Sequence, residues 1–330
     1  GRRASGEERL LIAVIGGAVG DALGAPLEGR CREQIATMQG ITDSFRPYRH
    51  KGEVEFPLGQ YTDDTQLTLA IVKSLLTCGR VDPADIAAEF VKLWESREIV
   101  GAGQVAHRAV GRLMEGIRWE EAAAADDLPW NGAAMRIAPV GLWHFDDADQ
   151  LARDVELASF VTHRHPLAVD GAIAVATAVA YAATASEVDT ACFLDAVHGS
   201  VAGRSPGFAD RVRELHEWLA LTETAALAAI VADQGRAKGR GFGVPVRVEP
   251  TVLASLYVFL KSPGDYMATI ERALRVGGDV DTVAAIAGAI SGAYNGLGAI
   301  PANLVAGVKD SAEILDLGAR LFARRFTGTA

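Results

Sequence analysis

Two acidic segments that lie far apart in the chain each open an apolar helical pattern. Residues 62–65 are Thr-Asp-Asp-Thr, and residues 277–282 are Gly-Gly-Asp-Val-Asp-Thr. Asp and Thr are favoured at a helix start even without a function, because the first N–H groups are unpaired and the helix dipole is positive there. The neighbouring carboxylates of two such segments do not all fit as caps, however. They therefore predict a fold that joins two helix starts as the oxygen-rich walls of one cation site.

The spacing within each segment indicates which carboxylates face that site. Asp279 and Asp281 would point to nearly opposite sides of a regular helix but to the same side of an extended segment. We therefore expect the pair to precede its helix, which the second of them opens and residues 283–294 continue, with the two preceding glycines supplying backbone freedom. Asp63 and Asp64 are adjacent, so we expect one to cap its helix and the other to point outward as a ligand.

Signals for helix starts recur along the whole chain. Asp82 and Pro83 introduce an apolar pattern at helical spacing, with a cap residue followed by Pro at the first helical position. Similar starts occur at Asp149, Pro166, Asp189, Thr222 and Pro250. Roughly a dozen helices are predicted against almost no alternating strand pattern, and Pro245 weakens the best strand candidate, residues 244–248. The chain is predicted to be an all-α protein.

Small residues recur at four-residue spacing in two of the predicted helices. The first stripe is Gly16, Gly20 and Gly24, and the second is Ala284, Gly288, Gly292 and Gly296. Missing side chains let helix backbones approach closely, so both stripes predict tight helix crossings. We expect these glycines to place the acidic residues without taking part in chemistry.

We expect one domain over residues 1–330. No stretch rich in Pro, Ser or charge divides the chain, and the two acidic segments would fall on opposite sides of any central cut. A hydrophobic fraction of 49% provides ample material for a buried core. The chain begins Gly-Arg-Arg without Met, so residues 1–6 are expected to be a flexible or non-native N-terminus.

Charge and composition exclude several classes of protein. A net charge of −10 argues against broad nucleic-acid binding, which needs clustered Lys and Arg, and favours a cytoplasmic protein. Three cysteines without paired or metal spacing argue against a disulfide framework. The uncharged run over residues 282–308 is long enough to span a bilayer, but its glycines, Pro301 and two asparagines make it too polar, so we expect no membrane association. A monomer is the default expectation.

Three segments, in this order, resemble the ADP-ribosylglycohydrolase family, which includes dinitrogenase reductase-activating glycohydrolases and ADP-ribosyl-acceptor hydrolases. They are residues 16–28 (Gly-Gly-Ala-Val-Gly-Asp-Ala-Leu-Gly-Ala-Pro-Leu-Glu), residues 61–65 (Tyr-Thr-Asp-Asp-Thr) and residues 277–282 with the small-residue helix that follows. The ordered set covers nearly the whole chain. The resemblance implies a single-domain orthogonal helical bundle with two divalent cations, Mg²⁺ or Mn²⁺, at the base of a cleft for ADP-ribose.

The resemblance also implies roles for individual residues. The implied metal ligands are Thr62, Asp63, Asp64, Asp279, Asp281 and Thr282. Glu28 matches a family glutamate that lies at or near the metals and can gate the cleft. Together with Asp63, Asp64 and Asp279 it forms the expected catalytic set, and which carboxylate acts as the base stays open. Two divalent ions would nearly cancel the charge of five carboxylates, and an all-oxygen ligand set favours hard cations over zinc.

The family's substrate loop, Gly-Asn-Gly-x-x-Met-Arg, has a counterpart over residues 130–136. Trp130 replaces the first glycine, and the positions that match the motif are Asn131, Gly132, Met135 and Arg136. The resemblance implies that these four residues contact the ADP-ribosyl group. The backbone N–H groups of the first two are the expected partners for phosphate or hydroxyl oxygens.

Two further elements carry open alternatives. His163 matches the histidine of the family's Thr-His-x-x-Pro segment; it is either a cap or buried hydrogen-bonding group, or a contact to ribose or diphosphate. A zinc pair with His165 is disfavoured, because no third ligand lies at suitable spacing. The Gly-rich basic stretch 235–243 is either a solvated loop or part of the cleft mouth, with Phe242 stacking on adenine and Arg240 meeting phosphate.

The function expected from these observations is metal-dependent removal of ADP-ribose from a modified acceptor, by hydrolysis at the anomeric ribose carbon. An ADP-ribosylated protein or other ADP-ribosylated acceptor is the expected partner, and ADP-ribose is the product. A catalytically silent ADP-ribose binder is one alternative, and a hydrolase of another ribosyl or nucleotide glycoside is a second. The acceptor stays open between arginine, serine, another side chain, a nucleic-acid base and a small molecule, because the metal residues hold the ribose and not the leaving group.

Overall fold

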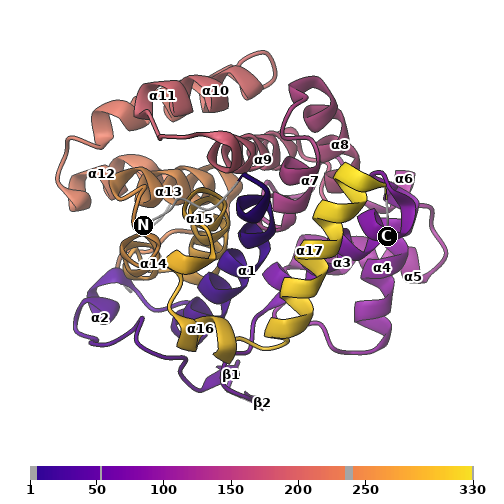
Figure 1. Cartoon of the computed structure of the whole chain (residues 1–330), viewed down its shortest axis with the longest axis horizontal. Coiled ribbons are helices and arrows are strands. Elements are labelled where there is room, and N and C mark those ends of the chain that lie inside the picture. Colours follow the sequence, from indigo (N-terminus) through magenta and orange to yellow (C-terminus); the bar gives the residue numbers. More distant parts are fainter. Residues whose placement is uncertain (1–5, 53, 235–240, 329–330) are drawn as a thin grey trace.

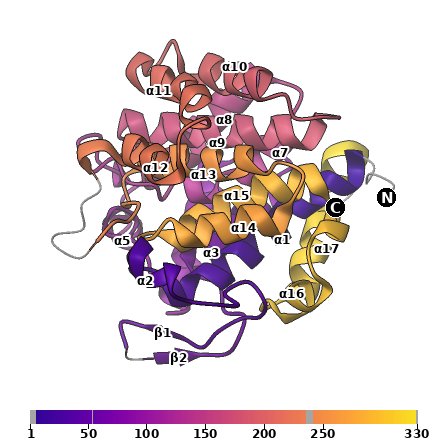
Figure 2. The same cartoon turned by 90° about the vertical axis from the view of Figure 1, so that its left-hand side faces the viewer.

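The computed structural model describes residues 6–52, 54–234 and 241–328, and these form a layered assembly of helices (Figures 1 and 2). The α-helices are α1 (Gly6–Gly24), α2 (Arg32–Ala36), α3 (Asp63–Cys78), α4 (Pro83–Glu95), α5 (Gln104–Met114), α6 (Trp119–Ala122), α7 (Ala138–Trp143), α8 (Ala148–Phe160), α9 (Pro166–Thr184), α10 (Thr190–Val201), α11 (Pro206–Trp218), α12 (Glu223–Val231), α13 (Val248–Lys261), α14 (Tyr266–Arg275), α15 (Val280–Asn295), α16 (Ala302–Gly307) and α17 (Ser311–Thr327). Short 3₁₀ turns are η1 (Ala25–Leu27), η2 (Ala134–Arg136), η3 (Ala232–Gln234) and η4 (Leu297–Ala299). Strands β1 (Tyr48–His50) and β2 (Val54–Phe56) pair as one antiparallel hairpin. The all-α prediction is confirmed.

Helices α1 and α15 cross at the centre of the molecule, as the two small-residue stripes predict (Figure 1). A Cβ atom on Gly16 would lie 2.5 Å from the carbonyl oxygen of Gly288, and one on Gly20 would lie 2.2 Å from that of Ala284. Both distances are too short for any side chain, so only glycine permits this approach. The crossing continues to Gly24, where a Cβ would lie 2.5 Å from the Asp281 Cα. The end of α1 therefore packs on the first turn of α15.

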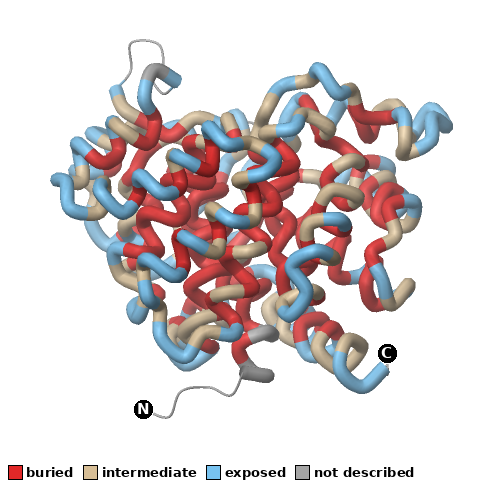
Figure 3. Tube along the Cα trace, turned by 90° about the horizontal axis from the view of Figure 1, so that it is seen from above, coloured by how far each residue is buried: buried red, intermediate tan, exposed pale blue. Residues whose placement is uncertain are grey.

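Helix α9 is a long and mostly buried helix of the core. It packs against α7, α8, α10, α13 and α15. Among the described residues it is the one helix of sufficient length and apolar character to cross a membrane, and 78% of that stretch is buried inside the protein. The uncharged run 282–308 forms most of α15 together with η4 and α16. Buried residues fill the interior and exposed residues cover the periphery (Figure 3).

The structure corrects several local expectations. Helix α8 is capped by Asp147, whose carboxylate accepts the Gln150 N–H, and not by Asp149. Helix α13 starts at Val248, ahead of Pro250. Residues 244–248 form isolated bridges to Gly278 and to Trp130 in place of a strand. Within the described part of the chain the stretch pairs with two separate segments and lies beside no strand, so it builds no sheet.

The β1–β2 hairpin was not predicted. Its strands have three residues each and are mostly polar, so they lack an alternating pattern, and a ring stack of Tyr48 on Phe56 with centroids 5.4 Å apart holds them. Gly6 is already the first residue of α1, whereas residues 1–5 of the expected flexible N-terminus lie outside the described residues. The expected phosphate contact of Arg240 also lies outside them.

Candidate active site

A cavity of about 160 Å³ opens where the ends of α1, α3 and α15 meet the segments before α5 and α7. Its acidic lining residues, which we call the carboxylate wall, are Glu28, Asp63, Asp64, Asp279 and Asp281. Uncharged lining residues, which we call the neutral wall, are Gly101, Gly103, Trp130, Gly132, Met135 and His163. A larger groove of about 1090 Å³ beside α16 and the start of α17 contains none of the predicted site residues. The chemistry that the sequence predicts therefore belongs to the smaller cavity.

The start of α3 is held by a carboxylate that sequence reasoning missed. Asp21, fully buried on α1, accepts the N–H and hydroxyl of Thr62 at 2.9 and 2.8 Å, and those of Thr65 at 3.2 and 2.7 Å. Thr62 is also the helix cap, since its hydroxyl accepts the Asp64 N–H. The expectation that Asp63 or Asp64 caps the helix is therefore wrong, and both carboxylates stay available. The available signal was a single acid in the otherwise small and apolar residues 10–24.

The start of α15 brings the second acidic segment to the same cavity. Gly277 and Gly278 adopt φ values of 81° and 79°, a left-handed conformation that glycine adopts without strain. Asp279 precedes the helix, but Asp281 lies within its first turn, so the pair does not precede the helix as a unit. The helix begins at Val280, one residue earlier than expected, because the close packing on α1 fixes this turn.

Hydrogen bonds hold Asp279 at the edge of the cavity. Its carboxylate accepts the Asn131 amide N–H at 2.6 Å and the Thr282 hydroxyl at 3.1 Å. Asn131 also contacts Thr251 at 3.0 Å, which anchors the amide between the substrate loop and α13. Asn131 lines the cavity, and its side-chain amide is already used to orient this carboxylate.

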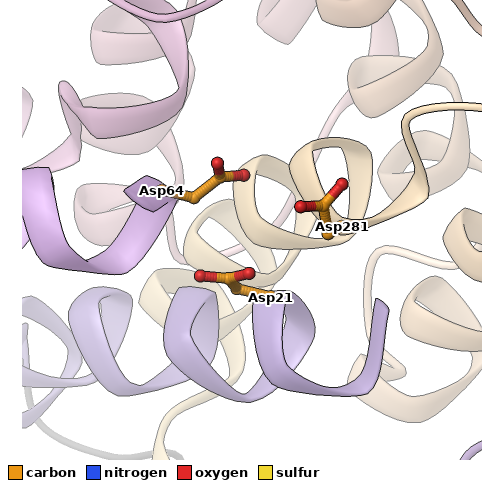
Figure 4. A group of neighbouring side chains, drawn as sticks. All are labelled: Asp21, Asp64 and Asp281. Atoms are coloured by element: carbon orange, nitrogen blue, oxygen red, sulfur yellow. The ribbon is translucent and has the colours of Figure 1, made fainter. Parts of the chain in front are cut away.

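Asp281 belongs to two groups of converging acids. Oxygens of Asp21, Asp64 and Asp281 lie within 4.8 Å of one another, and so do oxygens of Glu28, Asp279 and Asp281. Figure 4 shows the first group, with carboxylates from α1, α3 and α15 turned toward one another. One buried oxygen of Asp64 and one of Asp281 have no hydrogen-bond partner among the described residues. Buried acceptors without donors are the arrangement that a bound cation would satisfy.

The electrostatics of the carboxylate wall agree with this geometry. Burial, reinforced by the neighbouring acids, raises the pKa of Asp63, Asp64 and Asp281 well above the ordinary value. Burial likewise raises the pKa of Asp21 to about 6, although four hydrogen bonds oppose it. Glu28 reaches solvent on its outer side, but the protein around it and the charges of Asp279 and Asp21 raise its pKa to about 7. So much negative charge fits divalent cations with oxygen ligands.

The neutral wall is largely uncharged. Trp130, which stands where the family loop has glycine, lines the cavity beside Gly103, on which a Cβ would lie 3.9 Å from the indole ring. His163 also lines it and is only 2% exposed. Burial, reinforced by the charge of Arg136, lowers the pKa of His163 to about 3, so the ring is neutral at physiological pH. The two glycines before α5 belong to this wall and were not expected from the sequence.

Comparison with known proteins identifies the family. A family model described as ADP-ribosylglycohydrolase matches residues 2–329. The chain belongs to the ADP-ribosylglycohydrolase family. The ADP-ribosyl-[dinitrogen reductase] glycohydrolase of Rhodospirillum rubrum is 30% identical over 89% of this chain and 88% of its own length. The ADP-ribosylhydrolase ARH3 of Gallus gallus is 27% identical, over 87% and 85%.

A solved structure supports the same assignment. It is described as an ADP-ribosylglycohydrolase-related protein complex and matches with a TM-score of 0.76 and 25% identity, over 97% of this chain and 99% of that one. The orthogonal helical fold of the ADP-ribosylglycohydrolase family is thereby established for this chain. Family membership supports a hydrolase that acts on ADP-ribosyl groups.

Two residues expected to contact the substrate lie outside the cavity. Arg136 is fully buried behind the neutral wall, where its guanidinium contacts Thr162, the Ala158 carbonyl oxygen and the face of Phe90. An arginine in a Met-Arg motif reads as a ligand contact by sequence, but the 3₁₀ turn η2 directs it inward.

Phe242 is the second such residue. It lines a separate pocket of about 380 Å³ together with Arg32, Glu223 and Arg275, and its backbone bonds to α2 through Arg32 and Glu33. Stacking of this ring on adenine in the carboxylate cavity is not supported. The pairing to α2 holds residues 241–243 against Arg32 and the two glycines that precede Asp279, and Phe242 is not part of the cavity lining.

Proposed function

We propose that the chain is a metal-dependent hydrolase that binds two divalent cations, Mg²⁺ or Mn²⁺, and releases ADP-ribose from an ADP-ribosylated acceptor. The observation that carries the proposal is the pair of acidic groups that share Asp281, with buried unpartnered oxygens on Asp64 and Asp281. The residues that would hold the ions are Thr62, Asp63, Asp64, Asp279, Asp281 and Thr282, with Glu28 and Asp21 beside them. We propose that the chain works as one domain and as a cytoplasmic monomer.

Hydrolysis at the anomeric carbon needs an activated water and a positioned sugar. Bound divalent ions would lower the pKa of water, bind ribose hydroxyl oxygens and compensate the charge of the carboxylate wall. The water oxygen forms a bond to the anomeric carbon, the bond from that carbon to the acceptor breaks, and the leaving atom takes up a proton. Carboxylates around the anomeric carbon favour an oxocarbenium-like transition state.

Glu28 is the carboxyl group best placed to exchange protons with solvent. The other four acids of the carboxylate wall are at most 8% exposed, whereas Glu28 is exposed at the mouth of the cavity. A group that touches both the wall and bulk water is suited to take a proton from the attacking water and pass it on. Asp279 is instead held by Asn131 and Thr282, which suits it to a fixed ligand role.

The natural acceptor is proposed only as a class. Relatives act, by their names, on ADP-ribosyl-dinitrogen reductase and as ADP-ribosylhydrolases, so we propose an ADP-ribosylated protein as the substrate. A silent ADP-ribose binder is disfavoured, because it has no need to keep unpartnered buried carboxylates, which destabilise a metal-free fold. A hydrolase of another ribosyl glycoside would keep the same carboxylate wall.

The proposal is tested with a panel of defined ADP-ribosyl linkages on arginine, serine and small-molecule acceptors. Each is incubated with the protein in Mg²⁺, in Mn²⁺ or in EDTA, and free ADP-ribose is measured. We expect release from at least one linkage that EDTA abolishes. Tight binding of ADP-ribose without any release would identify a silent binder. Neither binding nor release would move the assignment to another glycoside, and release unaffected by EDTA would remove the metals from the proposal.

A further inference from the structure

A buried triad of polar side chains, Arg136, Thr162 and His163, stands behind the neutral wall. The Arg136 guanidinium donates to the Thr162 hydroxyl oxygen at 2.6 Å, and the same oxygen lies 2.6 Å from the His163 Nδ1. The three residues are 0%, 1% and 2% exposed. No role in binding or catalysis has been assigned so far to Thr162, and Arg136 is too deep to touch a ligand in the cavity.

The chemistry of the three groups leaves one order of hydrogen bonds. A guanidinium has donors and no acceptor, so the Thr162 oxygen must accept from Arg136. A hydroxyl has a single proton, and Nδ1 of His163 is its one acceptor among the described residues. Thr162 therefore donates to Nδ1, which must be unprotonated. Since the ring is neutral, its proton resides on Nε2.

The packing of the ring fixes where that Nε2–H group lies. A Cβ on Gly132 would lie 2.6 Å from Cε1 and 2.7 Å from Nε2 of His163, so this edge of the ring faces the substrate loop. Only a glycine leaves room for it there. Among the described residues no protein group accepts the Nε2–H, and the ring lines the cavity of the carboxylate wall.

We propose that Arg136 and Thr162 are positioning residues that hold His163 as the Nε2–H tautomer, so that it donates to an oxygen atom of the bound ADP-ribosyl group. This inference rests on the proposed function for the identity of the ligand. It assigns Arg136 of the Met-Arg motif a role through Thr162 in place of direct contact. It also explains why a donor-only side chain, and not an acceptor, stands at the far end of the triad.

Two variants of Thr162 form the test. Thr162→Val removes the hydroxyl at nearly constant shape, and Thr162→Ser keeps it as the matched control. Nitrogen-15 NMR of the histidine rings reports the tautomer, and calorimetry reports the affinity for ADP-ribose. We expect the Nε2–H form in the wild type and in Thr162→Ser. In Thr162→Val we expect a mixed or Nδ1–H form and roughly three- to tenfold weaker binding, the worth of one hydrogen bond.

The outcomes separate this inference from the proposed function. A wild-type ring protonated on Nδ1 would overturn the inference directly, even where Thr162→Val fails to fold. An unchanged tautomer in folded Thr162→Val would do the same, and equal losses of affinity in both variants would reduce Thr162 to packing. No binding of ADP-ribose by the wild type would instead count against the proposed function, while the NMR result would still decide the tautomer.

Discussion

The two walls of the cavity are built in different ways. Acids of the carboxylate wall stand at or near the ends of α1, α3 and α15, so helix packing fixes their positions. The neutral wall comes mainly from the segments before α5 and α7, and hydrogen bonds such as those of the buried triad orient it. The first wall holds carboxylates against their mutual repulsion, whereas in the second the His163 Nδ1 is paired with Thr162 and the other ring nitrogen has no protein partner among the described residues. The contrast is the one expected if the first wall binds cations and the second orients the ADP-ribosyl group, as proposed above.

We expect the largest effect from neutralising Asp281, the acid that belongs to both clusters of the carboxylate wall. Asp281→Asn should lower ADP-ribose release by roughly 100-fold or more, since metal assistance supplies several kcal/mol and 1.36 kcal/mol is a factor of ten in rate. In EDTA its melting temperature should equal or exceed that of the wild type, because one charge leaves a repulsive buried cluster. Release assays and thermal unfolding measure both.

Asp316→Asn is the matched control, because its carboxylate is 66% exposed on α17, at the molecular surface. It should leave activity and melting temperature unchanged. Full activity in Asp281→Asn would contradict the assignment of the carboxylate wall. A large loss of metal-free stability would show that Asp281 stabilises the fold and does not strain it.

Asp21 tests whether support from behind the carboxylate wall matters as much as the ligands themselves. The Asp21 carboxylate accepts four hydrogen bonds, from the N–H and hydroxyl groups of Thr62 and Thr65. In Asp21→Asn one oxygen is replaced by an NH₂ group that cannot accept, so the Thr62 hydroxyl loses its fixed orientation. The affinity for Mn²⁺ should fall by roughly 10–100-fold, as is typical when a group that orients a metal ligand is removed. Titration of metal-free protein with Mn²⁺ by electron paramagnetic resonance gives the dissociation constant.

The control for Asp21 is Thr65→Val, which removes one donor from the same carboxylate without touching Thr62. We expect its Mn²⁺ affinity to stay within about threefold of the wild type. If both variants lose affinity equally and in proportion to stability, Asp21 serves the fold alone. If neither loses affinity, Thr62 needs no orientation from Asp21.

The carboxylate wall was more accessible to prediction from the sequence than the neutral wall. Helix caps, glycine stripes and paired acids are local patterns, and each has a physical meaning that holds within one helix. The contact of Gly16 with Gly288 follows from such stripes. The role of Asp21 was not predicted, because its hydrogen-bond donors, Thr62 and Thr65, belong to another helix. The sequence around a single acid does not show which groups donate to it.

The neutral wall depends on contacts that no local pattern contains. Arg136 was expected in the cavity because it matches the family's substrate loop, but the 3₁₀ turn η2 directs it inward. For Phe242 the cavity mouth was one of two alternatives, because its ring suits stacking on adenine, but pairing to α2 places it in another pocket. The orientation of His163 depends on Thr162 next to it and on a buried guanidinium that reaches it from another segment. Residue type predicted the kind of contact, and only the fold determined the partner.

The pH dependence of stability should distinguish the walls in the metal-free protein. The pKa of Asp21 is raised to about 6 and that of Glu28 to about 7, so the folded state holds protons that the unfolded state has lost. Stability in EDTA should therefore be greatest below about pH 4, apart from other groups, fall as pH rises from there to about 6 to 7, and level off above that. Saturating Mn²⁺ should reverse the trend, because the ions displace these protons when they bind. For each proton displaced, the affinity for Mn²⁺ should rise by up to roughly tenfold per pH unit.

Thermal unfolding from about pH 5 to about pH 8, with EDTA or Mn²⁺, measures this dependence. Asp281→Asn should flatten the EDTA curve, whereas Thr162→Val should leave its slope unchanged. Equal stability across this range in EDTA would mean that the acids are not strained without metal. A slope altered by Thr162→Val would show that the two walls titrate together.

The smallest effect is expected at Trp130, which tests the role of the neutral wall. Trp130→Ala removes an aromatic surface from the cavity but no charge and no metal ligand. Affinity for ADP-ribose should fall by roughly three- to tenfold, the usual worth of an aromatic contact, with Mn²⁺ affinity unchanged. Because this side chain stands where the family loop has glycine, its loss should also widen the range of acceptors from which ADP-ribose is released. The linkage panel measures that range, and a change in Mn²⁺ affinity without any change in substrate range would place Trp130 in support of the carboxylate wall.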